Sequence, residues 1–417
     1  MTEKSLKIKK SLLQTKLKRQ HQMGVTYKLK IQAKTKRKKL LLNSVFTQAK
    51  WLYNFLIFNT DKAYNANKLE TVLVKVGDSF KERQLSLLGS QIKQEIGHRL
   101  IDNLKGISIL KKNGSKIGVL KPKKFLNSVP LKQYGVTYKL DFSRNRIYIQ
   151  KLCSFRILGL KQIPPDCDIA SAVLLRKPNG FYVHVTTYQE KKNISTINKP
   201  IGIDFGVKDK INLSNGLKID FEVPESKRLK LLQNVLSRKK KNSKNREKIK
   251  ALLRKEYQRI LNIRRDCQNR IIGFLKNYEK VMFQDDNIKG WHINFGRQVQ
   301  HSGVGTLKSR LCSSLEPIIL SASEPTTKEC FLCGNKREIS LSERYYICDC
   351  SWRIDRDINS ALNILKKGFN VDPNHILSLD WAEVTPVEWK TTWRILGHSP
   401  YIRLSIHDEA GSSRIYP

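Results

Sequence analysis

The chain has 417 residues, enough for about two to four domains, and its hydrophobic fraction of 40% is typical of a folded protein. Lysine and arginine number 79 against 36 acidic residues, so the formal net charge is +43. No run of about eighteen apolar residues could span a membrane, and no apolar segment follows the basic N-terminus as in a secretory signal. Because so large a charge makes a fold repel itself, we expect a polyanion, nucleic acid, as the partner. A membrane surface is the weaker alternative, since basic residues occur along the whole chain rather than on one amphipathic helix.

The first 24 residues form a basic arm that is nearly free of acidic residues. It is either disordered or becomes ordered on nucleic acid. Alternation of apolar residues predicts a strand at 25–31, and from about residue 36 the period becomes helical. Further helical segments are predicted at 68–76 and 84–104, followed by a basic loop.

Strand patterns return at 135–141, 146–150 and 155–158. A further pair, 170–176 and 181–188, is joined by Pro178-Asn179-Gly180, which is typical of a turn. These segments predict a small antiparallel sheet or barrel interrupted early by a helical insert. The stretch 191–198 is the expected linker to the next domain.

A second domain is expected to centre on Gly202-Ile203-Asp204-Phe205-Gly206. Alternating residues lead into one acidic residue, and Asn215-Gly216 between two further apolar runs predicts a hairpin. We expect Asp204 in the middle of a strand within this antiparallel arrangement. A carboxylate there needs a compensating cation or hydrogen-bond donors, so Asp204 is either a satisfied structural residue or a ligand of a divalent metal.

Residues 224–280 predict long basic helices. A run of positive charge within them is either a solvated face or a polyanion contact, and like charges at helical spacing favour the contact. The candidate nucleic-acid-binding residues are Arg238, Lys239, Lys240, Lys241, Lys244 and Arg246.

Four of the eight cysteines are single and four cluster. The cluster, Cys330, Cys333, Cys348 and Cys350, has the spacing of a zinc ribbon in which two turns bring paired thiolates to one ion. The second pair is one residue closer than in the common motif. Whether both Cys348 and Cys350 bind is therefore left open.

A short strand at 281–283 precedes Gln284, Asp285 and Asp286, and a helix begins near Asp357. Asp204 and Asp357 are candidates for a site that cleaves phosphodiesters with two magnesium ions, which requires several carboxylates. A third carboxylate is expected where the strand at 281–283 ends.

These motifs, GIDFG, FQDDNIKGW, the cysteine pairs and DRDINSALNIL, resemble in their order the transposon-encoded TnpB nucleases and the type V CRISPR effectors. The resemblance implies an α+β multidomain fold: an RNase H-like (RuvC) nuclease domain with an inserted zinc ribbon, preceded by a wedge-like β-barrel that carries a helical recognition insert. The implied boundaries are 1–24 for the arm, 25–34 and 126–192 for the barrel, 35–125 for the insert, 198–327 and 353–367 for the nuclease domain, 328–352 for the ribbon, and 368–417 for an irregular C-terminal tail.

Carried over by position, the resemblance makes Asp204 the first catalytic carboxylate and Asp357 the last. The family's middle residue is the Glu of an E-D-L-N-x-K-G motif, and Gln284 stands in its place. Three explanations follow: a natural nuclease-dead relative, a deliberate isosteric substitution, or replacement by Asp285. The last is disfavoured because a shift of one residue turns a strand side chain to the other face.

The resemblance implies an RNA-guided DNA endonuclease of the prokaryotic cytoplasm, with cleavage impaired by Gln284. The expected partners are a guide RNA and double-stranded target DNA, with no membrane, and a monomer with RNA is favoured. Two magnesium ions and one structural zinc are the implied metals. The main alternative is a nuclease-dead repressor. A transposase lacks a visible strand-transfer feature, and a generic RNA-binding protein would not explain the ordered carboxylates.

Overall fold

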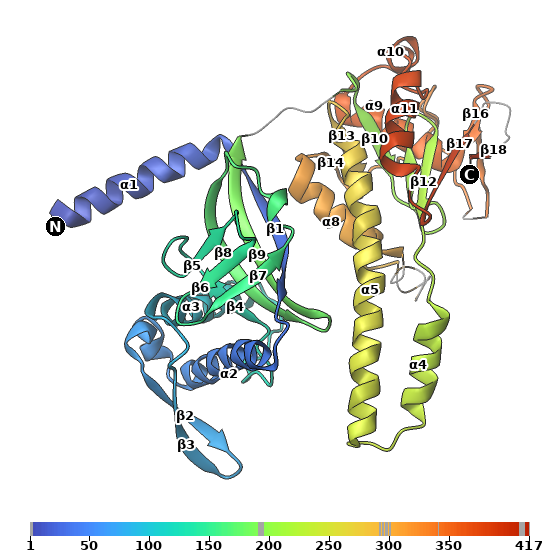
Figure 1. The fold of residues 1–417 in the computed structure, drawn as a ribbon. Helices are drawn as coiled ribbons and strands as arrows, with labels where there is room; N and C mark the ends of the chain where they lie inside the picture. The colour runs from blue at the N-terminus through green and yellow to red at the C-terminus, as the bar shows by residue number, and fades with distance from the viewer. Residues whose placement is uncertain are drawn as a thin grey trace. The chain divides into compact units, whose positions relative to one another are not determined.

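The computed structural model describes residues 3–190, 196–291, 293, 296, 299, 302–340, 342–407 and 413–416. The chain forms two compact units, Met1–Lys192 and Asn193–Pro417 (Figure 1). No helix in the described ranges is both long and apolar enough to cross a lipid bilayer.

An antiparallel sheet forms the centre of the N-terminal unit, with its described strands in the order β4-β8-β9-β1-β7-β6-β5. The strands are β1 (Gln22–Gln32), β4 (Ser128–Leu131), β5 (Tyr138–Asp141), β6 (Arg146–Ile149), β7 (Ser154–Leu158), β8 (Asp168–Lys177) and β9 (Gly180–Glu190). The Tyr138 hydroxyl of edge strand β5 donates to the Ala170 carbonyl of β8, 3.2 Å away, so the sheet curls back towards itself. The predicted strands and the turn between β8 and β9 are confirmed.

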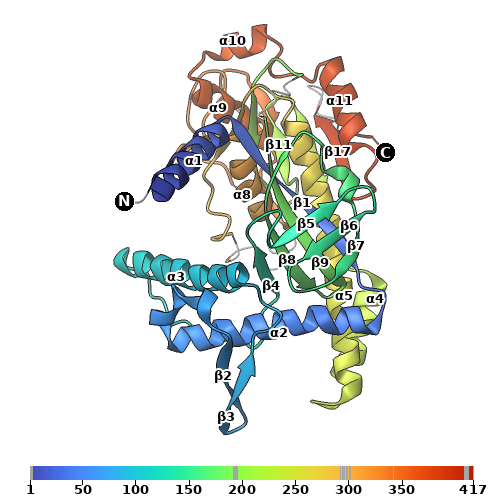
Figure 2. The same ribbon diagram turned by 60° about the vertical axis from the view of Figure 1, so that its left-hand side comes forward.

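Two helices, α2 (Lys36–Phe58) and α3 (Ser90–Lys112), pack together in the segment between β1 and β4. The predicted helix at 68–76 is wrong. Residues there form a hairpin, β2 (Thr71–Val76) and β3 (Ser79–Gln84), which projects beyond both helices in Figures 1 and 2. Its turn begins at Gly77, whose φ of +64° suits a two-residue hairpin loop. Alternating valines in β2 favour a strand, and a stretch of nine residues is too short to define a helical period.

The basic arm is helical in this structure: α1 covers Glu3–Gln20. At its C-terminal end Lys18 pairs with Asp168 at 2.8 Å, and the Arg19 guanidinium lies 4.0 Å from the centre of the Tyr188 ring. Strand β1 follows at Gln22, three residues before the predicted start.

A mixed sheet forms the centre of the C-terminal unit, in the order β14-β13-β10-β11-β12-β17-β18. The strands are β10 (Ile201–Asp204), β11 (Ile211–Leu213), β12 (Leu217–Phe221), β13 (Val281–Gln284), β14 (Ile318–Leu320), β17 (Ile402–His407) and β18 (Ser413–Tyr416). Strands β10, β13 and β14 are parallel, while β11, β12, β17 and β18 continue the sheet as antiparallel pairs. The hairpin predicted at Asn215-Gly216 is confirmed. Asp204, however, is the last residue of β10 rather than a mid-strand residue.

Alternation along the strands separates the two faces of this sheet. Ile201, Ile203 and Phe283 belong to a core shared with α5, α8 and α11. Gly202 and Met282 point the other way, against α9. We call this second side, which also carries Asp204, the α9 face. The helices are α4 (Lys227–Ser237), α5 (Lys244–Leu275), α8 (Val304–Leu315), α9 (Arg356–Phe369), α10 (Pro373–Ser378) and α11 (Pro386–Leu396).

The C-terminal segment from residue 368 is not an irregular tail, contrary to the sequence prediction. It contains α10 and α11, and its strand β17 pairs with β12. Glu388 of α11 is fully buried and forms a 2.7 Å ion pair with Lys199, just before β10. Two prolines of this segment, Pro373 and Pro386, occupy the first turn of each helix, where a missing N–H costs nothing.

Candidate functional site

Asp204 lies at the carboxyl end of β10, on the α9 face. The Ser360 hydroxyl of α9 donates a 2.9 Å hydrogen bond to its Oδ1. Burial, together with the like charges of Asp357 and Asp286, raises the pKa of Asp204 well above its usual range. The neighbouring groups therefore do not compensate the negative charge of Asp204. A bound cation would compensate it.

Asp357 lies in the first turn of α9, and its neighbour Asp355 has a different role. Asp355 Oδ1 accepts hydrogen bonds from the backbone N–H groups of Asp357 and Ile358, and its Oδ2 pairs with Lys218 at 2.6 Å. It is thus the N-cap of α9, held in place by a buried ion pair. The Asp357 carboxylate pairs with Arg356 at 3.1 Å and lies near enough to Asp204 for its charge to act on that residue. The structure brings together the two aspartates that the sequence singled out.

Gln284, the last residue of β13, also lies on the α9 face, and both ends of its amide form hydrogen bonds. Its Nε2 donates to the backbone carbonyls of Ser321 and Glu324, at 2.9 and 2.7 Å. Its Oε1 accepts from the Thr326 hydroxyl at 2.7 Å. Because backbone carbonyls only accept hydrogen bonds, the amide nitrogen must face them. Gln284 therefore ties β13 to the segment 321–326.

The two residues after Gln284 point in different directions. Asp285 is exposed and pairs with Lys308 of α8 at 2.8 Å, so it lies on the side away from α9. Asp286 is half-buried, and burial raises its pKa to about 6. Its charge acts on Asp204, so the two carboxylates lie near each other. Sequence reasoning did not select Asp286, although the alternation of strand side chains gave the signal.

Asn212 of β11 lies directly opposite Asp204 in the antiparallel pair, so the two side chains share a face. It is fully buried, and its Oδ1 has no hydrogen-bond partner among the described residues. An unpaired buried oxygen is costly and suggests a missing ligand. The oxygens of Asp204, Asn212 and the nearby carboxylates are the kind that magnesium prefers.

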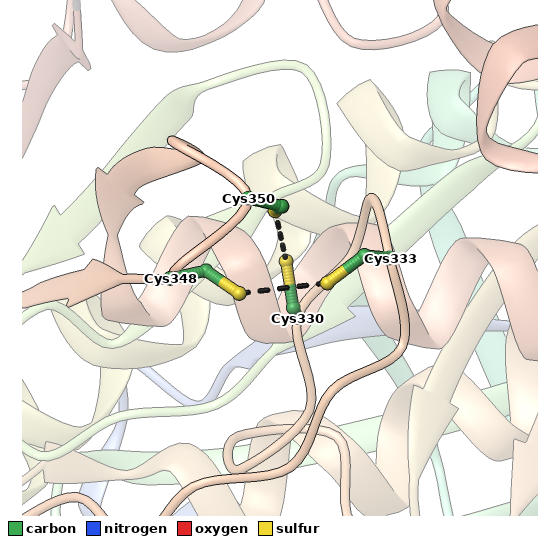
Figure 3. Close-up of side chains that lie close together, drawn as sticks. All are labelled: Cys330, Cys333, Cys348 and Cys350. Atoms are coloured by element: carbon green, nitrogen blue, oxygen red, sulfur yellow. Dashed lines mark hydrogen bonds between the residues drawn. The ribbon is translucent and has the colours of Figure 1, made fainter.

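The four cysteines of the predicted ribbon come together. Their sulfur atoms all lie within 4.8 Å of one another (Figure 3). Cys330 and Cys350 approach to 3.7 Å, and Cys333 and Cys348 to 3.5 Å. Among the described residues, no other group of three or more His, Cys, Asp or Glu side chains brings its ligand atoms so close together. The four thiols could bind a structural zinc.

The shortened second pair of cysteines is accommodated by its backbone. In the first turn Gly334, with φ of +77°, donates its N–H to the Cys330 carbonyl. In the second turn Ser351, with φ of +67°, donates to the Cys348 carbonyl in the same way, one residue earlier. Both Cys348 and Cys350 reach the cluster, so the structure gives no reason to exclude either.

The basic residues 238–246 lie at the connection between α4 and α5. Arg246 Nη1 donates to the carbonyls of Leu236 and Lys239, both at 2.7 Å, and so closes the end of α4. The other members of the predicted set are exposed: Arg238, Lys239, Lys240, Lys241 and Lys244.

The chain thus combines a mixed sheet that has carboxylates where its central strands end with a four-cysteine cluster that could hold a metal ion. Residues 315–364 match the family model described as Cas12f1-like, TNB domain. A protein of Streptomyces pristinaespiralis named "Putative RNA-guided DNA endonuclease" is 30% identical over 40% of this chain and 45% of its own length. The Escherichia coli protein named "Putative RNA-guided DNA endonuclease InsQ" is 26% identical over 57% of this chain and 66% of its own length.

Among solved structures, the cryo-EM structure of a Cas12f1-sgRNA-target DNA complex is similar, with 14% identity and a TM-score of 0.24, over 82% of this chain and 98% of that one. The matches to the two curated relatives span about half to two thirds of their lengths. The family model and these relatives support the resemblance of this chain to TnpB proteins and type V CRISPR effectors.

Proposed function

We propose that this protein is an RNA-guided DNA endonuclease that binds a guide RNA and hydrolyses matched DNA at an RNase H-like (RuvC) site. The observation that carries the proposal is the meeting of Asp204, at the end of β10, with Asp357, at the start of α9, on one face of the sheet. The strand order β12-β11-β10-β13-β14, with its parallel and antiparallel pairs, supports the RNase H-like assignment.

Asp204 and Asp357 are the residues that would hold magnesium, and the unpaired Asn212 oxygen fits the same group of hard ligands. When bound, the ions supply an activated water and stabilise the leaving oxygen of the phosphodiester. Ser360 orients Asp204 through its hydrogen bond. Cys330, Cys333, Cys348 and Cys350 would bind one zinc that holds the segment between β14 and α9 together.

The net charge of +43 supports nucleic acid as the partner. The exposed residues of the α4–α5 connection are proposed to contact its phosphates. The sheet of the N-terminal unit and its helical insert are proposed as the wedge and recognition parts that hold the RNA and read a short motif beside the target. In such a system base pairing reads the sequence, while the protein recognises shape and backbone charge.

A nuclease-dead RNA-guided repressor is the second candidate, and Gln284 favours it. The experiment that separates the two begins by sequencing the RNA that copurifies with the protein. Matched DNA is then incubated with the complex and magnesium, with Asp204→Ala as the inactive control. Cutting that Asp204→Ala abolishes supports the nuclease, and tight binding without cutting supports the repressor. A protein without RNA affinity at low salt would contradict both.

A further inference from the structure

The sequence left the third carboxylate of the proposed nuclease site unassigned, because position 284 holds an amide. A ligand for a divalent cation needs an oxygen that is free to face the ion. Gln284 is instead held at both ends of its amide, since its Oε1 accepts from Thr326 and its Nε2 donates to the Ser321 and Glu324 carbonyls. Its side chain is part of the scaffold.

Strand alternation points to the residue two positions further on. If the strand alternation continues past Gln284, side chains at 284 and 286 share a face, whereas 285 points to the opposite one. The extended pairing continues past Gln284, because the Asp285 N–H donates to the Leu320 carbonyl at 2.9 Å. The ion pair between Asp285 and Lys308 of α8 confirms that Asp285 faces away from α9.

We propose that Asp286 is the third carboxylate of this site and that, with Asp204 and Asp357, it binds the divalent cations. This inference rests on the proposed nuclease function. It implies that the chain is a cutting enzyme with its third ligand moved by two residues, rather than one disabled at position 284.

Two further observations support this assignment. The charges of Asp286 and Asp357 both act unfavourably on Asp204, a repulsion that divalent cations would relieve. The fully buried Asn212 Oδ1, on the strand beside Asp204, has no partner among the described residues and offers a neutral oxygen to the same site. This second observation is independent of the acidic residues.

The oxygens of Asp204, Asp286 and Asp357 do not all lie within 4.8 Å of one another. In the described part of the chain only the cysteine sulfurs form a group of three or more candidate ligand atoms within 4.8 Å. Two ions about 3.5–4 Å apart need ligands distributed around both, so a looser set of carboxylates is expected.

The test compares Asp286→Asn with Asp285→Asn, which removes the same charge from the neighbouring residue. The first experiment uses zinc-loaded protein with its RNA, to which Fe²⁺, ascorbate and peroxide are added. Radicals formed at bound iron cut the nearby backbone, and mass spectrometry maps the fragments. We expect cuts next to residues 204, 286 and 357 in the unmodified protein and in Asp285→Asn. In Asp286→Asn these cuts should fall at least about tenfold, as loss of a ligand weakens metal binding.

The second experiment measures magnesium-dependent cutting of matched DNA by the same proteins, with melting temperatures to verify folding. Asp286→Asn should cut at least about a hundredfold more slowly, while Asp285→Asn stays within about threefold. If Asp286→Asn cuts normally and Asp204→Ala does not, the inference is overturned and the nuclease stands. If the unmodified protein binds matched DNA without cutting it, the nuclease proposal fails. The iron map then decides the role of Asp286: cuts lost only in Asp286→Asn support it as a ligand, and unchanged cuts overturn it.

Discussion

The amide of Gln284 makes three hydrogen bonds that a carboxylate in its place could not all make. In Gln284→Glu the two carboxylate oxygens would face the Ser321 and Glu324 carbonyls, which only accept, and the Thr326 hydroxyl. A buried group left without a partner costs about 1–3 kcal/mol, and more when it is charged. We therefore expect Gln284→Glu to lower the free energy of unfolding by at least about 2 kcal/mol, measured by urea denaturation.

The matched control is Gln258→Glu, the same change at a side chain whose hydrogen bond to Asn262 is exposed. It should alter stability by no more than about 0.5 kcal/mol. If Gln284→Glu instead leaves stability unchanged and raises magnesium-dependent cutting, position 284 is the catalytic one and the chain is disabled by its glutamine, as the family motif implies.

Ser351 occupies a backbone conformation that suits glycine. Its φ of +67° lets the shortened cysteine turn close, whereas the first turn has Gly334 at the equivalent place. A left-handed conformation costs a residue with a side chain roughly 1 kcal/mol or more. Ser351→Gly should therefore raise the melting temperature of the zinc-loaded protein, and Gly334→Ala should lower it. Equal melting temperatures for Ser351→Gly and the unmodified protein would show that this strain is absent.

At the scale of elements, the contact between β10 and α9 determines how Asp204 and Asp357 meet. Gly202 makes this contact possible, because a Cβ there would lie 2.2 Å from the Ala361 carbonyl. Gly202→Ala should push α9 away and cost about 1–3 kcal/mol of stability, with a loss of cutting. Gly273→Ala, in α5, is the control, because its Cβ would meet nothing within 4 Å. It should stabilise the helix by up to about 1 kcal/mol. Chemical denaturation of both variants measures the difference.

The cysteine cluster is also an element whose order depends on its ligand. About one zinc per chain is expected by metal analysis. Cys333→Ser should lose it and lower the melting temperature, because metal binding contributes directly to folding. Cys312→Ser removes an exposed thiol of α8 outside the cluster and should change neither quantity. Zinc retained in full by Cys333→Ser would contradict a four-thiolate site.

Local signals were sufficient to predict strands β1 and β5 to β9 of the N-terminal sheet, the Asn215-Gly216 hairpin and the cysteine cluster. They failed where partners far along the chain decide the structure. Strand β17 pairs with β12 across nearly the whole C-terminal unit, and nothing near residue 402 indicates that pairing. Similarly, Asp204 and Asp357 could be selected from the sequence, but the hydrogen bonds of Gln284 could not. Its three partners lie on residues 321–326, about forty positions further along the chain. Asp286 could have been selected from the sequence, because this chain has an additional acidic residue where the E-D-L-N-x-K-G motif has Leu.

At the scale of the whole molecule, the charge of +43 is the dominant property, and the α4–α5 connection offers a place to test it. Each phosphate contact with single-stranded RNA adds about 0.7 to the slope of log affinity against log salt. The triple variant Lys239→Gln, Lys240→Gln, Lys241→Gln should therefore lower this slope by about 2 for RNA binding. Its melting temperature should not change, because these side chains are exposed.

Two comparisons make this result specific to the connection. Neutralising Lys250 and Lys328, which pair with Glu247 and Glu338 within the protein, should change the slope by less, because their charge is already balanced. Arg246→Gln should instead lower the melting temperature, because Arg246 closes α4 through the Leu236 and Lys239 carbonyls. If the triple variant binds RNA with an unchanged slope, the run of lysines is a solvated surface and the RNA is bound elsewhere. So large a positive charge still requires a polyanion to neutralise it. Measuring the salt dependence of RNA binding for variants of other exposed lysines would then locate the surface that binds the RNA.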